Sequence, residues 1–312
     1  KLALFCNVDK EAIIESIDAE TIYDVPNLMM KEGLHTVVMK KLGLKTEEKP
    51  ILTAWNKFLN NYKNPKETVE IGLVGKYIEL QDAYKSILEA LEHAGAHNQL
   101  RVNIHPIHSE DLNRKNVDEK LKGLHGLVVA PGFGDRGIEG KIIAVRYVRE
   151  KGIPFLGICL GMQMAVIEYA RNVLNLENAN STEMSRGTKH PVIDIMEDQK
   201  MVTEKGGTMR LGAWDCRLEK GSKAYAIYGQ EIISERHRHR YEFNNDYLKM
   251  MEDAGLKATG FNPKTGLVEI VEIEDHPWFV GVQYHPEYKS TVLNPHPLFM
   301  SFVKAASLHK GQ

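Results

Sequence analysis

The chain is organised around Ile-Pro-Phe-Leu-Gly-Ile-Cys-Leu-Gly-Met-Gln at residues 153–163. Residues 153–158 have the length and bulk of a buried parallel strand, and residues 160–171 carry apolar side chains at helical spacing. Gly157 and Gly161 stand where this strand would turn into the helix, and glycine permits a turn too tight for other residues. The stretch therefore predicts a strand that bends sharply into a helix.

Cys159 lies at the centre of this predicted bend, in the pattern Gly-x-Cys-x-Gly. The bend would hold its thiol at the carboxyl end of the sheet, facing a helix amino terminus, where the helix dipole favours a thiolate. Most free cysteines are inert core residues, and Cys6 and Cys216 are predicted to be so because they lack this context. Cys159 is the predicted nucleophile.

Strand-like and helical stretches alternate from residue 68 onward. The expected strands are 69–74, 102–105, 126–130 and 153–158, with helices at 83–94 and 140–151, hairpin-like strands at 212–217, 267–273 and 279–284, and a final helix at 297–309. Such alternation implies right-handed crossovers and a mostly parallel sheet flanked by helices. The predicted fold class is α/β, with ligands at the carboxyl ends of the strands.

Composition narrows the functional classes. The 312 residues are 43% hydrophobic, enough for a proper core, and 40 basic residues nearly balance 42 acidic ones, so no global field points to nucleic acid or an anionic membrane. Three scattered cysteines fit a reducing compartment, and no apolar run has the length of a membrane span. We expect a soluble, cytoplasmic protein. Residues 1–8 are expected to form a buried strand entered partway through a larger protein.

His285 is the best candidate among 13 histidines to act as base for the thiol. It follows the predicted strand 279–284, and Glu287 stands two residues later, where an extended backbone can aim both side chains at one site. The alternative, a surface histidine beside a solvated glutamate, would be favoured for an isolated histidine. Together with the bend at Cys159, the pattern predicts a Cys-His-Glu triad.

The loop Ala-Pro-Gly-Phe-Gly-Asp-Arg-Gly at residues 130–137 follows another predicted strand. Its Gly-x-Gly-x-x-Gly pattern is weak evidence for a dinucleotide site, because the next strand ends in Cys159 where a ribose-binding acid is needed. Exposed backbone amides beside the thiol are better suited to an oxyanion hole, with Gly132 and Leu160 as the N–H pair.

The remaining motifs carry less information. The basic run at residues 236–241 is too short to indicate a nucleic-acid site, and the glycine-rich residues 206–212 are interpreted as a mobile lid. No spacing indicates a metal site, and the chain has no P-loop pattern.

Taken together, these motifs resemble known enzymes. The glycine-flanked bend at Cys159, called the elbow below, and the distant His-Pro-Glu at residues 285–287 resemble the class I (triad) glutamine amidotransferases. Four further stretches resemble the CTP synthases in particular. These are Gly-Leu-Val-Gly-Lys-Tyr-Ile-Glu-Leu (72–80), Asn-Ala-Asn-Ser-Thr-Glu (178–183), Gly-Gly-Thr-Met-Arg-Leu-Gly (206–212) and Glu-Arg-His-Arg-His-Arg-Tyr-Glu (235–242).

The resemblance implies an organisation in three parts. Residues 68–312 would be a flavodoxin-like glutaminase domain, 45–67 an interdomain linker, and 1–44 the carboxyl-terminal remnant of a P-loop synthetase domain whose P-loop part is absent here. Cys159 would release ammonia from glutamine through a thioester, and the intact enzyme, a ligase, would use that ammonia, ATP and magnesium to aminate UTP to CTP. GTP would be the allosteric activator, the glutaminase domain would need no cofactor or metal, and the intact protein would be a homotetramer.

The resemblance also assigns roles by position. Gly132, Gln163, Glu183 and Arg240 would bind glutamine, Phe133 and Arg210 would contact GTP, and Lys1 and Asp18 would belong to incomplete UTP and ATP sites. One position departs from the family, which has glycine where this chain has Pro131. Proline lacks an N–H, so Gly132 is left as the donor in this loop.

Two alternatives remain open from sequence. A gamma-glutamyl peptidase on the same fold would use the same triad, although Glu183 and Arg240 favour free glutamine. A non-catalytic regulatory or filament-forming module is the second alternative, although no triad member is missing.

Overall fold

The computed structural model describes residues 1–44, 51–195 and 209–311, and the chain divides into two compact units, Lys1–Asn64 and Pro65–Gln312. Each unit is described by itself. No helix in the described parts of the chain is both long and apolar enough to span a bilayer.

The first unit is helical. It contains α1 (Leu2–Phe5), α2 (Val25–Lys31), α3 (Leu34–Lys41) and α4 (Thr53–Lys63), with 3₁₀ turns at Lys10–Ala12 and Ile22–Asp24. Residues 53–62 have an amphipathic sequence and lie in α4. Residues 28–44 carry apolar side chains mostly at helical spacing, but Gly33, whose φ is 78°, divides this segment between α2 and α3.

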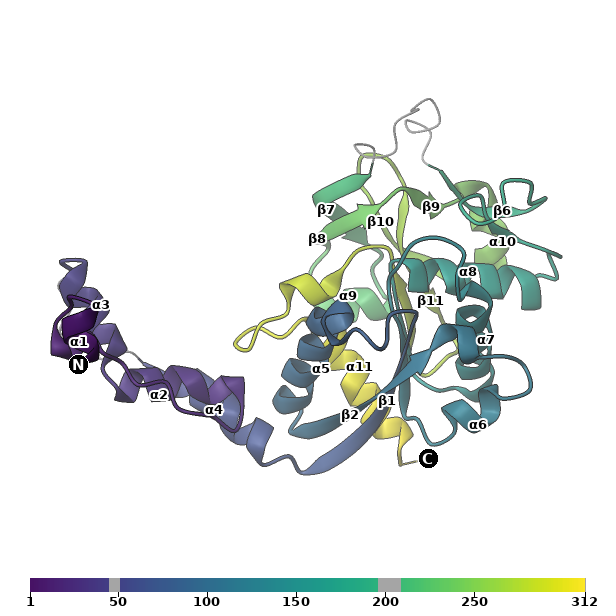
Figure 1. Ribbon diagram of the computed structural model, residues 1–312. Helices are drawn as coiled ribbons and strands as arrows, with labels where there is room; N and C mark the ends of the chain where they lie inside the picture. The colour runs from purple at the N-terminus through teal and green to yellow at the C-terminus, as the bar shows by residue number, and fades with distance from the viewer. Residues whose placement is uncertain (45–50, 196–208, 312) are drawn as a thin grey trace. The chain divides into compact units, whose positions relative to one another are not determined.

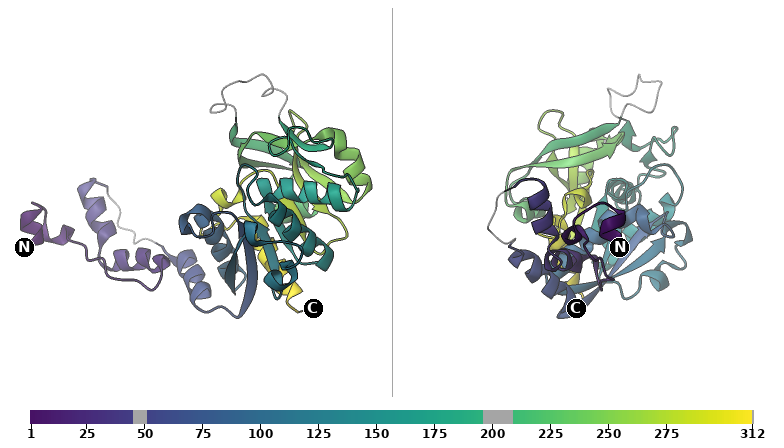
Figure 2. Two further views of the ribbon diagram at one scale, coloured as in Figure 1. Left: turned by 45° about the vertical axis from the view of Figure 1, so that its right-hand side comes forward. Right: turned by 60° about the vertical axis from the view of Figure 1, so that its left-hand side comes forward.

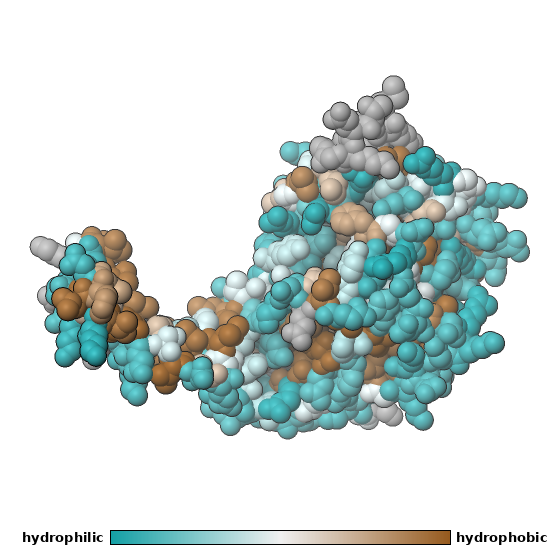
Figure 3. Space-filling model, in the orientation of Figure 1, coloured by the Kyte–Doolittle hydropathy of each residue, from teal (hydrophilic) through white to brown (hydrophobic). Residues whose placement is uncertain are grey.

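The strand expected at residues 1–8 is wrong, because this segment contains the short helix α1. No strand of the first unit is available to pair with it within the described residues, so the backbone satisfies its hydrogen bonds locally. Its apolar side chains stay exposed, with Leu4 at 85% and Phe5 at 87%, and brown side chains gather on the visible surface of this unit (Figure 3). The small core of the first unit is aromatic, and the ring centres of Tyr23 and Phe58 lie 4.9 Å apart.

The second unit is built on a nine-stranded sheet of order β2-β1-β3-β4-β12-β11-β10-β7-β8. Its strands are β1 (Glu67–Gly75), β2 (Leu100–His108), β3 (Gly126–Val129), β4 (Phe155–Ile158), β7 (Arg210–Leu218), β8 (Ile232–His239), β10 (Leu256–Phe261), β11 (Val268–Ile273) and β12 (Phe279–Val282). The first five in spatial order are parallel, and the last four extend the sheet in antiparallel fashion. A separate small sheet contains β5 (Asn180–Ser181), β6 (Pro191–Ile195) and β9 (Tyr241–Phe243).

Helices cover both faces of the parallel part, as Figures 1 and 2 show. The helices α5 (Lys85–His97) and α11 (Pro297–His309) pack on one face, and α7 (Ile138–Lys151) and α8 (Leu160–Asn172) pack on the other. Shorter helices are α6 (Val117–Leu121), α9 (Lys223–Tyr228) and α10 (Leu248–Asp253). The α/β class with a parallel sheet between helix layers is confirmed, and the two buried cores on either side of the sheet hold its strand ends in fixed positions.

Candidate active site

The predicted bend lies between β4 and α8. Cys159 has a φ of 53°, a left-handed conformation rare outside glycine, and its side chain is buried. A Cβ at Gly161 would stand 2.2 Å from the Val129 carbonyl oxygen, and one at Gly157 would stand 2.8 Å from the Gly161 backbone. Because no larger side chain fits at either glycine, the tight approach of α8 to the sheet depends on both of them.

The distant histidine reaches this bend through strand pairing. β12 lies parallel to β4, with Gly281 opposite Gly157 and Val282 opposite Ile158. The N–H of Cys159 donates to the Val282 carbonyl at 2.7 Å, which fixes the elbow to the end of β12. Parallel neighbours end at the same edge of a sheet, so the residues that follow β12 emerge beside the thiol.

His285 and Glu287 form the second half of the site. The His285 Nδ1 lies 2.8 Å from Glu287 Oε1, and each residue is only 5% exposed. Burial by itself lowers the pKa of His285, but its interaction with Cys159, and then with Glu287, raises that pKa well above its ordinary value. The arrangement therefore favours an imidazolium, whose Nδ1 lies on the Glu287 carboxylate while its Nε2 is buried without a hydrogen-bond partner among the described residues.

The oxyanion loop lies against the elbow. A Cβ at Gly132 would be 3.5 Å from a methyl group of Leu160, so the two predicted donors are neighbours. Within the described residues, neither backbone N–H donates a hydrogen bond to another group. Both are free to donate to negative charge that develops beside Cys159.

Three of the residues expected to bind glutamine are connected to the tyrosine that begins β9. Gln163 is buried and its Nε2 donates to the Tyr241 carbonyl at 3.0 Å. Burial raises the pKa of the Tyr241 hydroxyl, which Glu183 raises further and Arg240 lowers, so both charged side chains act on this ring. Glu183 also accepts a hydrogen bond from the Gly134 N–H at 3.0 Å, which connects it to the oxyanion loop.

The residues expected to contact GTP have different environments. Phe133 is 44% exposed, and the Arg238 guanidinium lies 5.8 Å from its ring centre. Arg210 is buried and forms ion pairs with Glu242 at 3.3 Å and Glu269 at 2.6 Å, so it faces inward.

Other predicted positions lie elsewhere. Residues 206–208 of the lid predicted at 206–212 lie outside the described residues, as do residues 45–50 of the predicted linker. Lys1 and Asp18 are exposed in the first unit.

Three functional candidates were missed by sequence reasoning. Gln283 donates through Nε2 to the Cys159 sulfur at 3.6 Å, and its Oε1 accepts from Gln163 at 3.1 Å. Period-two alternation from His285 would have indicated that Gln283 faces the same way. Lys76 donates to the Phe133 carbonyl, and Lys141 donates to the Ala130 carbonyl at 2.7 Å. Lys141 had a signal in sequence, because it is a charged residue on the apolar face of α7.

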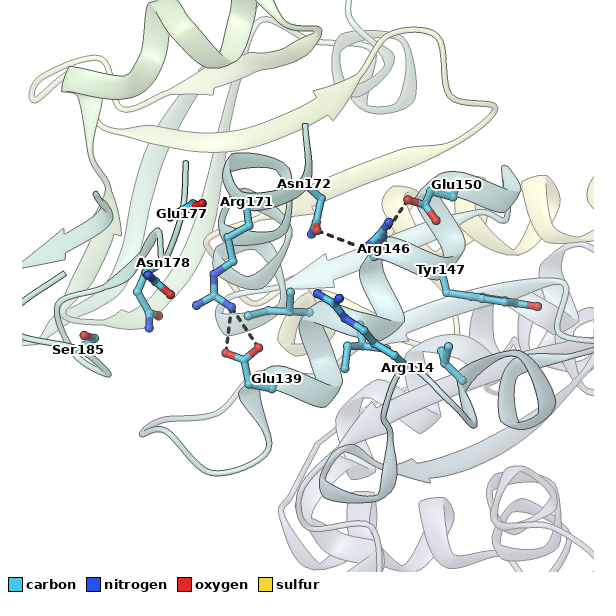
Figure 4. Close-up of a pocket in the computed structure, with 14 residues that line it drawn as sticks. Arg114, Glu139, Arg146, Tyr147, Glu150, Arg171, Asn172, Glu177, Asn178 and Ser185 are labelled. Carbon is cyan, nitrogen blue, oxygen red and sulfur yellow. Dashed lines mark hydrogen bonds and ion pairs between the residues drawn. The ribbon is translucent and has the colours of Figure 1, made fainter. Parts of the chain in front are cut away.

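A groove of about 970 Å³ lies elsewhere, lined by residues of α6, α7, α8 and the segment 177–185 (Figure 4). Its charges largely pair with one another, since Arg171 contacts Glu139 at 2.9 Å and Arg146 contacts Glu150 at 2.8 Å. It contains none of the predicted site residues. No cluster of three or more metal-ligating side chains occurs in residues 1–44, 51–195 and 209–311.

Comparisons with known proteins give matches to two families. The family described as glutamine amidotransferase class-I matches residues 79–305, and the family described as CTP synthase N-terminus matches residues 1–44. A CTP synthase of Flavobacterium psychrophilum is 67% identical over all of this chain and 58% of its own length, and one of Bacteroides fragilis is 58% identical over 98% of this chain and 57% of its own. The chain thus spans somewhat more than half the length of these curated relatives.

A solved structure provides a further match. The glutaminase domain of Trypanosoma brucei CTPS with bound acivicin is 40% identical, with a TM-score of 0.72, over 77% of this chain and 94% of that chain. Family match, relatives and solved structure agree on the family. The chain belongs to the class I glutamine amidotransferases and, within them, to the CTP synthase family.

Proposed function

We propose that this chain hydrolyses glutamine to glutamate and ammonia. Cys159, as a thiolate, attacks the side-chain amide carbon, and the N–H groups of Gly132 and Leu160 stabilise the oxyanion of the tetrahedral intermediate. His285 gives its proton to the leaving nitrogen, so that ammonia departs and a thioester remains. Water, deprotonated by His285, then attacks the thioester, and collapse releases glutamate and regenerates the thiolate.

One observation carries the proposal. The Cys159 elbow and the His285–Glu287 pair emerge at the ends of two hydrogen-bonded parallel strands, which supports the roles of nucleophile, base and orienting carboxylate. The elevated pKa of His285 supports the role of proton donor to the leaving group.

Recognition of glutamine is assigned to the residues around Tyr241. We assign the substrate's amino group to Glu183 and its carboxylate to Arg240, whose planar guanidinium suits a bidentate contact. Gln163 and Gly132 complete this set. The carbonyl of Tyr241 holds Gln163 in place, which supports its assignment to the site.

The role of the intact protein belongs to the same proposal. Ammonia from the glutaminase domain, residues 68–312, would be used by a synthetase domain that aminates UTP to CTP with ATP and magnesium. Residues 1–44, including Lys1 and Asp18, would be the end of that domain, and 45–67 the linker. GTP would act as activator near Phe133 and Arg210, and the intact protein would be a cytoplasmic homotetramer. The names of the relatives and the match to residues 1–44 support this assignment.

Glutamate release tests the proposal directly. The purified protein should release glutamate from glutamine, and Cys159→Ala should lose at least about 10⁴-fold of the rate because the covalent route is removed. An electrophilic glutamine analogue should modify Cys159 alone, as read by mass spectrometry, with Cys216→Ala as the matched control that retains full labelling. Activity that persists in Cys159→Ala, or an adduct on Cys6, would refute the assignment. Preference for gamma-glutamyl peptides over free glutamine would establish the peptidase instead.

A further inference from the structure

Lys141 is a fully buried lysine beneath the oxyanion loop. It lies in the second turn of α7 and is 0% exposed. Its Nζ donates to the carbonyl oxygen of Ala130, the residue that directly follows β3, at 2.7 Å. A side chain that starts on a helix thus holds the first peptide group of the loop that carries Gly132.

The ammonium also lies close to the donor residue itself. A Cβ at Gly132 would be 3.9 Å from Lys141 Nζ, and 3.5 Å from the Leu160 side chain. Lys76 approaches from the end of β1, with its Cε 3.6 Å from the same point, and donates to the carbonyl of Phe133 on the other side of Gly132. The loop is therefore held at two carbonyls that flank its oxyanion donor.

No carboxylate within the described residues forms an ion pair with Lys141. Burial, and then repulsion from Lys76, lower the pKa of Lys141 to about 7, and the opposing influence comes from Cys159. Cys159 also raises the pKa of His285, so Lys141 and His285 both interact with the same sulfur. The anion that can balance the buried lysine is the thiolate, or the oxyanion that forms next to it.

Packing alone does not explain a lysine here. Burial of an ammonium without a carboxylate opposes folding, and an unbranched apolar side chain of similar length would fill the same space without that penalty. A residue that lowers stability next to reacting atoms is a candidate for function.

We propose that Lys141 is a positioning residue for glutamine hydrolysis, which fixes the Ala130 carbonyl so that the Gly132 N–H points at the oxyanion and which favours negative charge at Cys159. This inference rests on the proposed glutaminase function. It assigns a role to a residue outside the triad, the oxyanion donors and the glutamine-binding set.

Three substitutions in the full-length protein separate the two parts of this role. Lys141→Met removes donor and charge, and should lower the kcat of glutamine hydrolysis by about 10²-fold, as for loss of an oxyanion donor, with little change in KM. The pH midpoint for alkylation of Cys159 by iodoacetamide should rise by about one unit, because a neighbouring cation is lost. Lys141→Gln keeps a donor for Ala130 and should recover part of kcat without recovering the midpoint, whereas Lys141→Arg should recover the midpoint.

The matched control is Lys223→Met, because the Lys223 ammonium also donates to main-chain carbonyls, at 3.2 and 3.0 Å, but lies in α9 outside the site. Wild-type kcat and midpoint in Lys141→Met, or equal losses in Lys223→Met, would overturn the inference. If Lys141→Met does not fold, equal alkylation midpoints in the Gln and Arg variants would overturn it. Failure of the glutaminase proposal is distinguishable, because the wild type would then release no glutamate while the alkylation midpoint still reports on Lys141.

Discussion

Replacement of Lys141 by methionine should make the protein more stable, and the gain should depend on pH. The fall in the pKa of Lys141 from 10.5 to about 7 corresponds to about 5 kcal/mol against folding with the ammonium charged. Methionine removes this cost but leaves the Ala130 carbonyl without its donor, which costs about 1–3 kcal/mol. The net expectation at pH 6 is therefore a gain of about 2–4 kcal/mol in the free energy of unfolding.

The sign of the pH dependence follows from proton binding. Below about pH 7 the lysine is charged in both the folded and the unfolded protein, so the full cost is present. Between about pH 7 and 10.5 the unfolded chain holds a proton that the folded protein has already released, so the stability of the wild type rises with pH. The advantage of Lys141→Met should therefore shrink as the pH rises through this window.

Urea unfolding of wild type and variant at pH 6 and pH 9.5 measures this difference, with Lys223→Met measured in parallel. A methionine variant that is less stable than wild type at pH 6, or a difference that stays constant between the two pH values, would refute the reasoning. A more stable variant with slower glutamine hydrolysis would be the signature of a residue retained for function at the expense of stability.

Two further substitutions test the packing that positions the site. Gly161→Ala places a Cβ 2.2 Å from the last carbonyl oxygen of β3 and should lower the free energy of unfolding by about 1–3 kcal/mol or more. Gly187→Ala is the control, because a Cβ at Gly187 would have no atom within 4 Å, and it should leave the free energy of unfolding unchanged. Equal melting temperatures of the two variants would contradict this prediction. Arg149→Met breaks a two-point ion pair at 2.7 and 2.8 Å with the fully buried Glu168 and should cost about 3–5 kcal/mol in urea unfolding. The double variant Arg149→Met with Glu168→Gln should recover part of that loss, and a double variant as unstable as the single one would argue against a desolvated charge as the cause.

The strand, bend and helix of the site were predictable because each depends on residues that are close together in the sequence. The strand, bend and helix around Cys159 occur where the sequence places them, at β4 and α8. The segment 1–8 was misinterpreted because its secondary structure depends on residues outside the segment. An apolar run fits a buried strand or a short helix, and only a neighbouring strand can decide between them.

The environments of charged residues were beyond sequence reasoning. Arg210 was expected at a lid and instead lies buried between Glu242 and Glu269, contributed by β9 and β11. The position of Lys141 on the apolar face of α7 could be read from the sequence, but its contact with the Ala130 carbonyl exists only once α7 packs on the sheet. The burial of a charged side chain and the groups around it decide its pKa and its interactions, and neither can be read from the residues next to it in the sequence.

The sequence by itself determined that Cys159 sits in a glycine-flanked bend and that His285 and Glu287 follow a strand, because backbone sterics and side-chain periodicity act over a few residues. Only the tertiary structure decided that β12 enters the sheet next to β4, more than a hundred residues after it, and so delivers the imidazole to the sulfur. Strand pairing is selected by the packing of the whole core, in which many pairings of similar apolar strands compete. The placement of Cys159 and His285 at neighbouring strand ends is a product of that competition.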